Sequence, residues 1–220
     1  MAIYQTDFMG EGYLGLFGFA TDKYCLISNR LSDNKQTKIA EHLKVDVIPT
    51  TIFNFFLSGI LSTGNSKSAL VPYLIDDSEL AHLRKRINVT PVPDKFTALG
   101  NLIAVNDYGG IISDVFSQKS KAVIDEALGI TTVQGKIAGS SEVGALCTVT
   151  NKGFVITPDV SDEEMRQLEK IFGVKGGRAS ANMGSKLVGI CVIANSNGFI
   201  VGQETTPIEL EYINEALGFL

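Results

Sequence analysis

The sequence predicts an α/β protein in which five repeated units close into a ring. Three observations support this fold class. First, a short motif recurs five times: a glycine, an apolar run, a turn and a second apolar run. Second, each copy is followed by a helix of amphipathic period, and most helices are followed by a segment of strand character. Third, the last unit lacks its final strand, whereas the N-terminus carries a strand-like segment with no unit of its own.

The motif is clearest where Gly100 precedes an apolar run that turns at Asn106-Asp107. Asn and Asp tolerate the left-handed backbone region and Gly adopts it freely, so each copy predicts a β-hairpin. The leading glycines follow one another at intervals of 44, 41, 44 and 45 residues: Gly15, Gly59, Gly100, Gly144 and Gly189. A constant interval of this size is typical of an internally repeated architecture.

The helices are predicted from apolar spacing and from their end signals. Ser161 begins a capping box with Glu164, and Pro207 occupies a first helical position. Gly129 and Gly173 are placed as C-caps. The predicted helices cover residues 33–43, 76–87, 123–128, 161–172 and 206–217.

A third strand is predicted after each of the first four helices, at residues 45–52, 89–92, 130–134 and 174–178. The unit is therefore strand, strand, helix, strand. After the fifth helix the chain stops, so we expect residues 1–14 to complete the last unit beside the strand Gly189–Ala194. Closure would remove exposed sheet edges. We accordingly expect one domain over residues 1–220.

Composition indicates a soluble, cytoplasmic globular protein. Of the 220 residues 45% are hydrophobic and 20% are charged, and no apolar run approaches the roughly 18 residues that span a bilayer. Residues 52–57 are interpreted as a buried strand, the N-terminus lacks signal-peptide features, and the three cysteines are interpreted as reduced core residues. A net charge of −5 disfavours a protein whose main task is to bind nucleic acid. It fits a basic protein partner or no charged partner at all, and mild acidity that only aids solubility is an equal alternative.

A five-bladed ring of ββαβ units with pseudo-fivefold symmetry resembles the pentein fold, a closed α/β propeller. Within that fold the chain is similar to the translation initiation factor 6 family. The similarity rests on Thr97-Ala98-Leu99-Gly100-Asn101, on Asn106-Asp107, on residues 177–184, on residues 194–198 and on residues 205–210. The chain ends soon after Gly218, which resembles the archaeal members of that family.

The resemblance implies a monomeric factor that binds the large ribosomal subunit. There it would cover ribosomal protein uL14 near the sarcin–ricin loop and exclude the small subunit, and it would also act in large-subunit biogenesis. No cofactor, metal or membrane is implied. The family usually has a glycine-rich segment where this chain has residues 52–57, so the contacts of the second unit stay open.

The alternative is a guanidine-modifying pentein enzyme, which needs a thiolate with a histidine and a carboxylate. The two histidines, His42 and His82, fall in predicted helices. Cys147 and Cys191 have apolar neighbours, which would raise the pKa of their thiols. The sequence therefore favours a binding protein over an enzyme.

Asn101 is the first candidate for ribosome contact, because the equivalent positions Ile60, Ala145 and Ile190 carry no amide. Its alternative role is a hydrogen bond at the start of the strand. Repeat symmetry and the family match add further candidates on the same face: Gly100, Gly59, Ile60, Asn65 and Ser66. Arg84-Lys85-Arg86 has two interpretations, a peripheral contact to rRNA phosphate or macrodipole partners on a solvated helix end, and the second is favoured.

Overall fold

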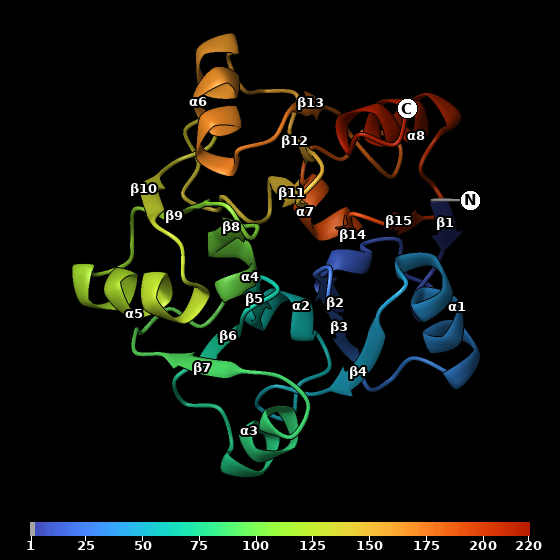
Figure 1. The fold of residues 1–220 in the computed structure, drawn as a ribbon. Coiled ribbons are helices and arrows are strands. Elements are labelled where there is room, and N and C mark those ends of the chain that lie inside the picture. The colour runs from blue at the N-terminus through green and yellow to red at the C-terminus, as the bar shows by residue number, and fades with distance from the viewer. Residues whose placement is uncertain (1–2) are drawn as a thin grey trace.

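The computed structural model describes residues 3–220, which form a mixed α/β fold with five three-stranded sheets arranged around a common centre (Figure 1). The longer helix of each unit lies outside the sheets, whereas short helical turns lie toward the centre (Figure 1). The sheets contain β2 (Gly18–Ala20), β3 (Tyr24–Ser28) and β4 (Asp46–Thr50); β5 (Thr63–Gly64), β6 (Ala69–Pro72) and β7 (Val89–Val92); β8 (Ile103–Val105), β9 (Gly110–Ser113) and β10 (Thr132–Gly135); β11 (Cys147–Val149), β12 (Phe154–Ile156) and β13 (Gly176–Arg178); β14 (Val192–Asn195), β15 (Gly198–Gly202) and β1 (Ile3–Thr6).

One longer helix follows the hairpin of each unit, so the predicted order of strand, strand, helix, strand is confirmed. These helices are α1 (Asp33–Leu43), α3 (Asp77–Arg84), α5 (Gln118–Leu128), α6 (Asp162–Phe172) and α8 (Pro207–Ala216). Their predicted end signals are confirmed as well. Ser161 and Glu164 form a capping box, Pro207 is the first residue of α8, and Gly129 caps α5 with a φ of 66°.

Each sheet combines an antiparallel hairpin with a parallel third strand. In the first unit β3 pairs with β2 antiparallel and with β4 in parallel, because α1 carries the chain back before β4 begins. The last unit follows the same rule, since β1 pairs in parallel with β15 and Ile3 lies opposite Phe199. The N-terminal segment thus completes the fifth sheet, but the predicted partner strand Gly189–Ala194 is wrong: the third strand always adds to the second strand of the hairpin.

This topology gives the molecule two ends. The first strand of every hairpin runs from the leading glycine, at what we call the glycine end, to the hairpin turn, at the turn end. The second and third strands run the opposite way and finish at the glycine end. Each helix therefore begins at the glycine end and finishes at the turn end. The linkers from each third strand to the next unit also lie at the glycine end.

We expected the leading glycines to begin the strands. They lie instead in single turns before the strands. Four of these turns are helical: η1 (Leu14–Leu16), α2 (Ser58–Leu61), α4 (Leu99–Leu102) and α7 (Val188–Cys191). A Cβ atom added at Gly100 would lie 1.8 Å from the carbonyl oxygen of Gly59. Equivalent contacts join each leading glycine to the preceding one, and Gly15 meets the carbonyl oxygen of Gly189. Glycine is therefore required here by close backbone approach.

Close approach also explains the glycines of the hairpin turns. We expected them to adopt the left-handed region, but Gly109 and Gly153 do not have a positive φ. A Cβ atom at Gly109 would instead lie 2.0 Å from the carbonyl oxygen of Ile171, in the helix of the next unit. The glycine signal was correct and its predicted physical cause was wrong.

The core consists of apolar clusters between each sheet, its helix and the neighbouring unit. In the fourth unit, for example, the rings of Phe154 and Phe172 pack edge to face with centroids 5.0 Å apart. Residues 52–57 are not the predicted buried strand. Ile52 is buried, but the segment is a loop that leaves Phe55 43% exposed. Among residues 3–220, no helix combines the length and the apolar character needed to cross a membrane.

Candidate functional site

The candidate site is a collar of five side chains at the glycine end. Each follows a leading glycine, and together they are Leu16, Ile60, Asn101, Ala145 and Ile190. Four of them are partly exposed, whereas Ala145 is buried. Asn101 is the single polar member, so the collar is an apolar surface that contains one amide.

The backbone and the side chain of Asn101 have different roles. Its carbonyl oxygen accepts hydrogen bonds from the backbone N–H groups of Gly144 at 2.8 Å and Ala145 at 3.2 Å, which joins the third unit to the fourth. Its side-chain amide makes no hydrogen bond to any of residues 3–220. The alternative structural role is therefore taken by the backbone carbonyl and not by the side chain.

Sequence reasoning missed a set of exposed apolar side chains beside the collar, which we call the apolar arc. Its members lie on three consecutive linkers: Met9, Tyr13, Phe55, Met183 and Leu187. Two of these linkers touch, since the Asn182 side chain donates to the carbonyl oxygen of Gly12 at 2.8 Å, and the third packs on the first unit through the stacked rings of Phe56 and Phe17. The sequence signal for this arc is the presence of apolar residues inside loops. In residues 52–57 the same signal predicts a buried strand, so the arc is not predicted.

Carboxylates from the helices fix the tips of the linkers. Glu79 accepts backbone hydrogen bonds from Phe53 and Asn54, which both have positive φ, and Glu209 accepts one from Gly184 at 2.8 Å. Burial opposes ionisation of Glu209, but hydrogen bonds from Thr206, Ser180 and Gly184 outweigh it and lower the pKa of its carboxyl. The surface is therefore held in place before any partner arrives.

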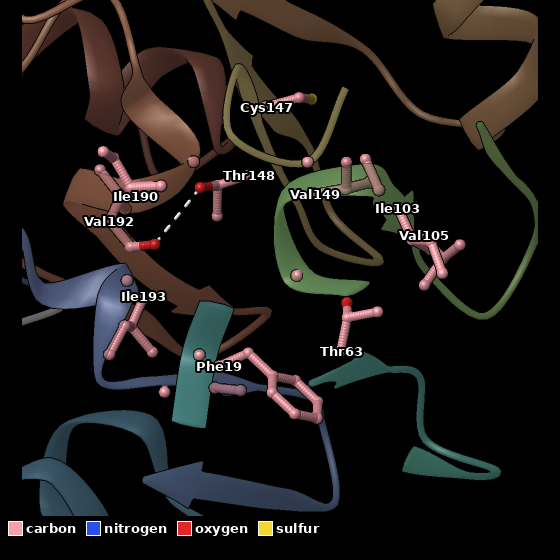
Figure 2. A pocket seen from close by; sticks show the side chains of 18 of the residues that line it. Phe19, Thr63, Ile103, Val105, Cys147, Thr148, Val149, Ile190, Val192 and Ile193 are labelled. Carbon is pink, nitrogen blue, oxygen red and sulfur yellow. Dashed lines mark hydrogen bonds between the residues drawn. The ribbon is translucent and has the colours of Figure 1, made fainter. Parts of the chain in front are cut away.

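A cavity of about 70 Å³ lies along the centre of the molecule, lined by the first strands of the five hairpins, by the leading glycines and by the collar residues Asn101 and Ile190 (Figure 2). The Thr148 hydroxyl donates across it to the carbonyl oxygen of Val192 at 3.3 Å (Figure 2). Most other labelled side chains around it are apolar, among them Phe19, Ile103 and Ile193 (Figure 2). Ligand pockets usually measure about 300–1,000 Å³, so this cavity suits no metabolite.

The residues that thiolate chemistry requires are not brought together. All three cysteines are buried, and burial raises the pKa of Cys25 to about 12 and that of Cys191 to about 11. His42 and His82 lie on α1 and α3, outside the sheets (Figure 1). Within residues 3–220, no three His, Cys, Asp or Glu side chains gather closely enough to bind a metal ion.

The structure divides the predicted site residues between the two ends. Gly59, Ile60, Gly100 and Asn101 lie at the glycine end, but Asn65 and Ser66 lie in the β5–β6 turn at the turn end. The expectation of a single face is wrong because a strand separates the leading glycine of each unit from its turn. Asn65 is buried, and its side chain donates to the carbonyl oxygen of Leu128 at 3.0 Å, in the helix of the next unit.

Comparison with known proteins matches residues 3–216 to the model of the eIF-6 family. The chain is 42% identical over 227 residues to translation initiation factor 6 of Pyrococcus horikoshii, with all of both chains covered. It is 34% identical to the proteins of the same name from Thermoplasma acidophilum and Methanosarcina mazei, with 98% or more of each chain covered. The family model covers nearly the whole chain and the relatives are similar over their full length, so the chain belongs to the eIF-6 family of translation initiation factors.

Proposed function

We propose that this protein binds the large ribosomal subunit through its glycine end and thereby prevents the small subunit from joining. The observation that carries the proposal is the Asn101 side chain, a partly exposed amide with no hydrogen-bond partner among residues 3–220. An unpaired amide surrounded by apolar side chains suits a protein–protein interface, where one hydrogen bond fixes the register of an apolar contact. Gly59, Ile60 and Gly100 belong to the same contact.

We propose a basic ribosomal protein, uL14 beside the sarcin–ricin loop, as the direct partner. The first turns of the helices lie at the glycine end, and several carry exposed acidic side chains: Asp33 in α1, Asp77 in α3, and Asp162 and Glu163 in α6. Exposed carboxylates beside an apolar centre favour encounter with a basic protein surface and help to exclude wrong partners.

The mechanism is steric and needs no cofactor, metal or covalent chemistry. Because carboxylates hold the linker tips, little free energy is lost in ordering the surface on binding. A bound factor of this size would occupy space that the small subunit needs. The same occupancy would protect the joining surface of a large subunit that is still being assembled, which is the proposed role in biogenesis.

The finer description of the molecule belongs to the same proposal. We propose a single domain over residues 1–220, a closed pentein ring with pseudo-fivefold symmetry, and a cytoplasmic monomer. Closure is supported by the pairing of β1 with β15 and by glycine contacts that return from Gly15 to Gly189.

Sedimentation with purified ribosomal subunits tests the proposal. The protein should co-migrate with the large subunit alone, and adding it should reduce the fraction of joined ribosomes. Thr131→Ala, at an exposed position at the turn end between α5 and β10, is a control that should sediment like the unmodified protein. Migration with the small subunit, or joining that the protein leaves unchanged, would refute the anti-association role.

A further inference from the structure

A groove at the turn end gathers five cations. Its lining consists of Lys23, Tyr24, Ser66, Lys67, Arg84, Lys85, Arg86, Ile87 and Asn88, and it encloses about 400 Å³. Three separate segments supply these residues: the β2–β3 turn, the β5–β6 turn and the connection from α3 to β7. No carboxylate lines the groove. In a protein of net charge −5, this is a local concentration of positive charge.

None of the five cations is neutralised by the protein. Six Lys or Arg side chains elsewhere in residues 3–220 form ion pairs with carboxylates, namely Lys35, Lys121, Lys136, Lys175, Arg178 and Lys186. The groove cations form no ion pair with residues 3–220, and all five are exposed. The macrodipole of α3 would account for Arg84, but not for Lys23 and Lys67, which come from turns.

The walls of the groove are held together by hydrogen bonds. The Asn88 side chain donates to the carbonyl oxygen of Lys67 at 3.1 Å, which fixes the β5–β6 turn against the end of α3. Lys67 Nζ donates to the carbonyl oxygen of Glu126 at 3.2 Å, so its stem is anchored on α5. These hydrogen bonds hold the segments that carry the cations in fixed positions relative to one another.

We propose that this groove binds the phosphodiester backbone of double-stranded RNA. Several unpaired cations along one groove match a ligand with regularly repeated anions. An acidic peptide fits less well, because Ile87 is the single aliphatic side chain in the lining and offers no pocket for peptide side chains. A single strand would be expected to stack on exposed aromatic rings, but Tyr24, the aromatic residue of the lining, is buried. The groove lies at the opposite end from the collar, so both surfaces can be occupied at once.

Fluorescence anisotropy with a labelled RNA duplex of about 20 base pairs tests the assignment. The key variant is the triple charge reversal Arg84→Glu, Lys85→Glu, Arg86→Glu. Its matched control is Arg30→Glu, Lys95→Glu, Lys119→Glu, which changes net charge equally but reverses exposed cations at the glycine end. The assay contains no ribosomal subunit, so its outcome is independent of the proposed docking through the collar.

The groove variant should bind the duplex at least about tenfold more weakly. The slope of the logarithm of its binding constant against the logarithm of salt concentration should be shallower by about 2–3, because each lost phosphate contact removes about 0.9. The control should lose less than about threefold. If the triple variant melts early, the double variant Lys23→Glu, Lys85→Glu tests the same groove from two other elements. Equal losses in groove and control variants, or tighter binding of single-stranded RNA or polyglutamate than of the duplex, would overturn the proposal.

Discussion

The two ends of the molecule join neighbouring units by different means. At the glycine end the central contacts are made by backbone, because leading glycines such as Gly59 and Gly100 let one turn touch the next. At the turn end, glycines such as Gly109 also approach backbone of the next unit, but buried asparagine side chains add hydrogen bonds between units. The Asn106 amide donates to the carbonyl oxygens of Thr150 at 3.0 Å and Phe172 at 2.9 Å, and the Asn151 amide bridges the carboxylates of Asp22 and Asp107.

The difference shows which polar side chains are free for a partner. Backbone contacts at the glycine end leave the side chain of Asn101 unused, whereas contacts at the turn end consume the side chains of Asn65, Asn106 and Asn195. The turn asparagines therefore hold neighbouring units together, whereas the side chain of Asn101 makes no hydrogen bond within residues 3–220. The following variants test this contrast, in order of expected effect.

Removing residues 1–10 should have the largest effect. The deletion strips β1 from β15, exposes a sheet edge and removes the fully buried Phe8, so the free energy of unfolding should fall by at least about 5 kcal/mol. Urea denaturation measures it. Phe8→Ala alone should cost about 3–5 kcal/mol, which separates the side chain from the strand. If the deletion lowers the free energy of unfolding no more than Phe8→Ala does, β1 adds no stability.

Gly100→Ala should be nearly as damaging. The new methyl group would lie 1.8 Å from the carbonyl oxygen of Gly59, and backbone at the centre of the molecule cannot move aside without disturbing both neighbouring turns. We expect a loss of about 4 kcal/mol by urea denaturation. Gly135→Ala is the control, because its added Cβ would lie 3.4 Å from the nearest atom, and it should cost less than about 1 kcal/mol. Similar losses in both variants would contradict the close-approach explanation.

Asn106→Ala should destabilise the turn end by about 2–4 kcal/mol, since it leaves two buried carbonyl oxygens without a donor. Asn106→Thr is an informative companion, because Thr21 and Thr150 occupy this position in the first and fourth units and cap their own turns. Threonine should restore the hydrogen bonds within the turn but not those to the next unit. The stability of Asn106→Thr should therefore lie between that of Asn106→Ala and that of the unmodified protein. Thermal melting that ranks threonine equal to asparagine would show that the inter-unit bonds are negligible.

Asn101→Ala should have the smallest effect on folding and a clear effect on binding. Its side chain makes no hydrogen bond within residues 3–220, so the free energy of unfolding should change by less than about 0.5 kcal/mol. Affinity for the large subunit should fall about five- to 150-fold, the equivalent of roughly 1–3 kcal/mol for an unpaired group in the interface. A sharp fall in melting temperature with unchanged affinity would make Asn101 a structural residue.

The order of elements could be predicted because its signals are local. Helix-end signals such as Ser161 and Pro207 act within a few residues of chain, and the leading glycines recur at a nearly fixed interval. Residues 52–57 show where local signals fail. Their apolar run predicted a buried strand, but the loop is held by Glu79 of α3, more than twenty residues further along the chain, and Phe55 remains exposed.

The sequence by itself determined the repeat, and the repeat fixed how units meet. Bonds between units span the same intervals that separate the glycines: 41 residues from Asn65 to Asn106 and 44 from Asn106 to Thr150. Only the tertiary structure decided that Asn65 and Asn101 lie at opposite ends, that β15 receives β1, and that Lys23 and Lys67 join Arg84 in one groove. These facts depend on strand direction and on which side chains the neighbouring unit already satisfies, and no single repeat encodes either.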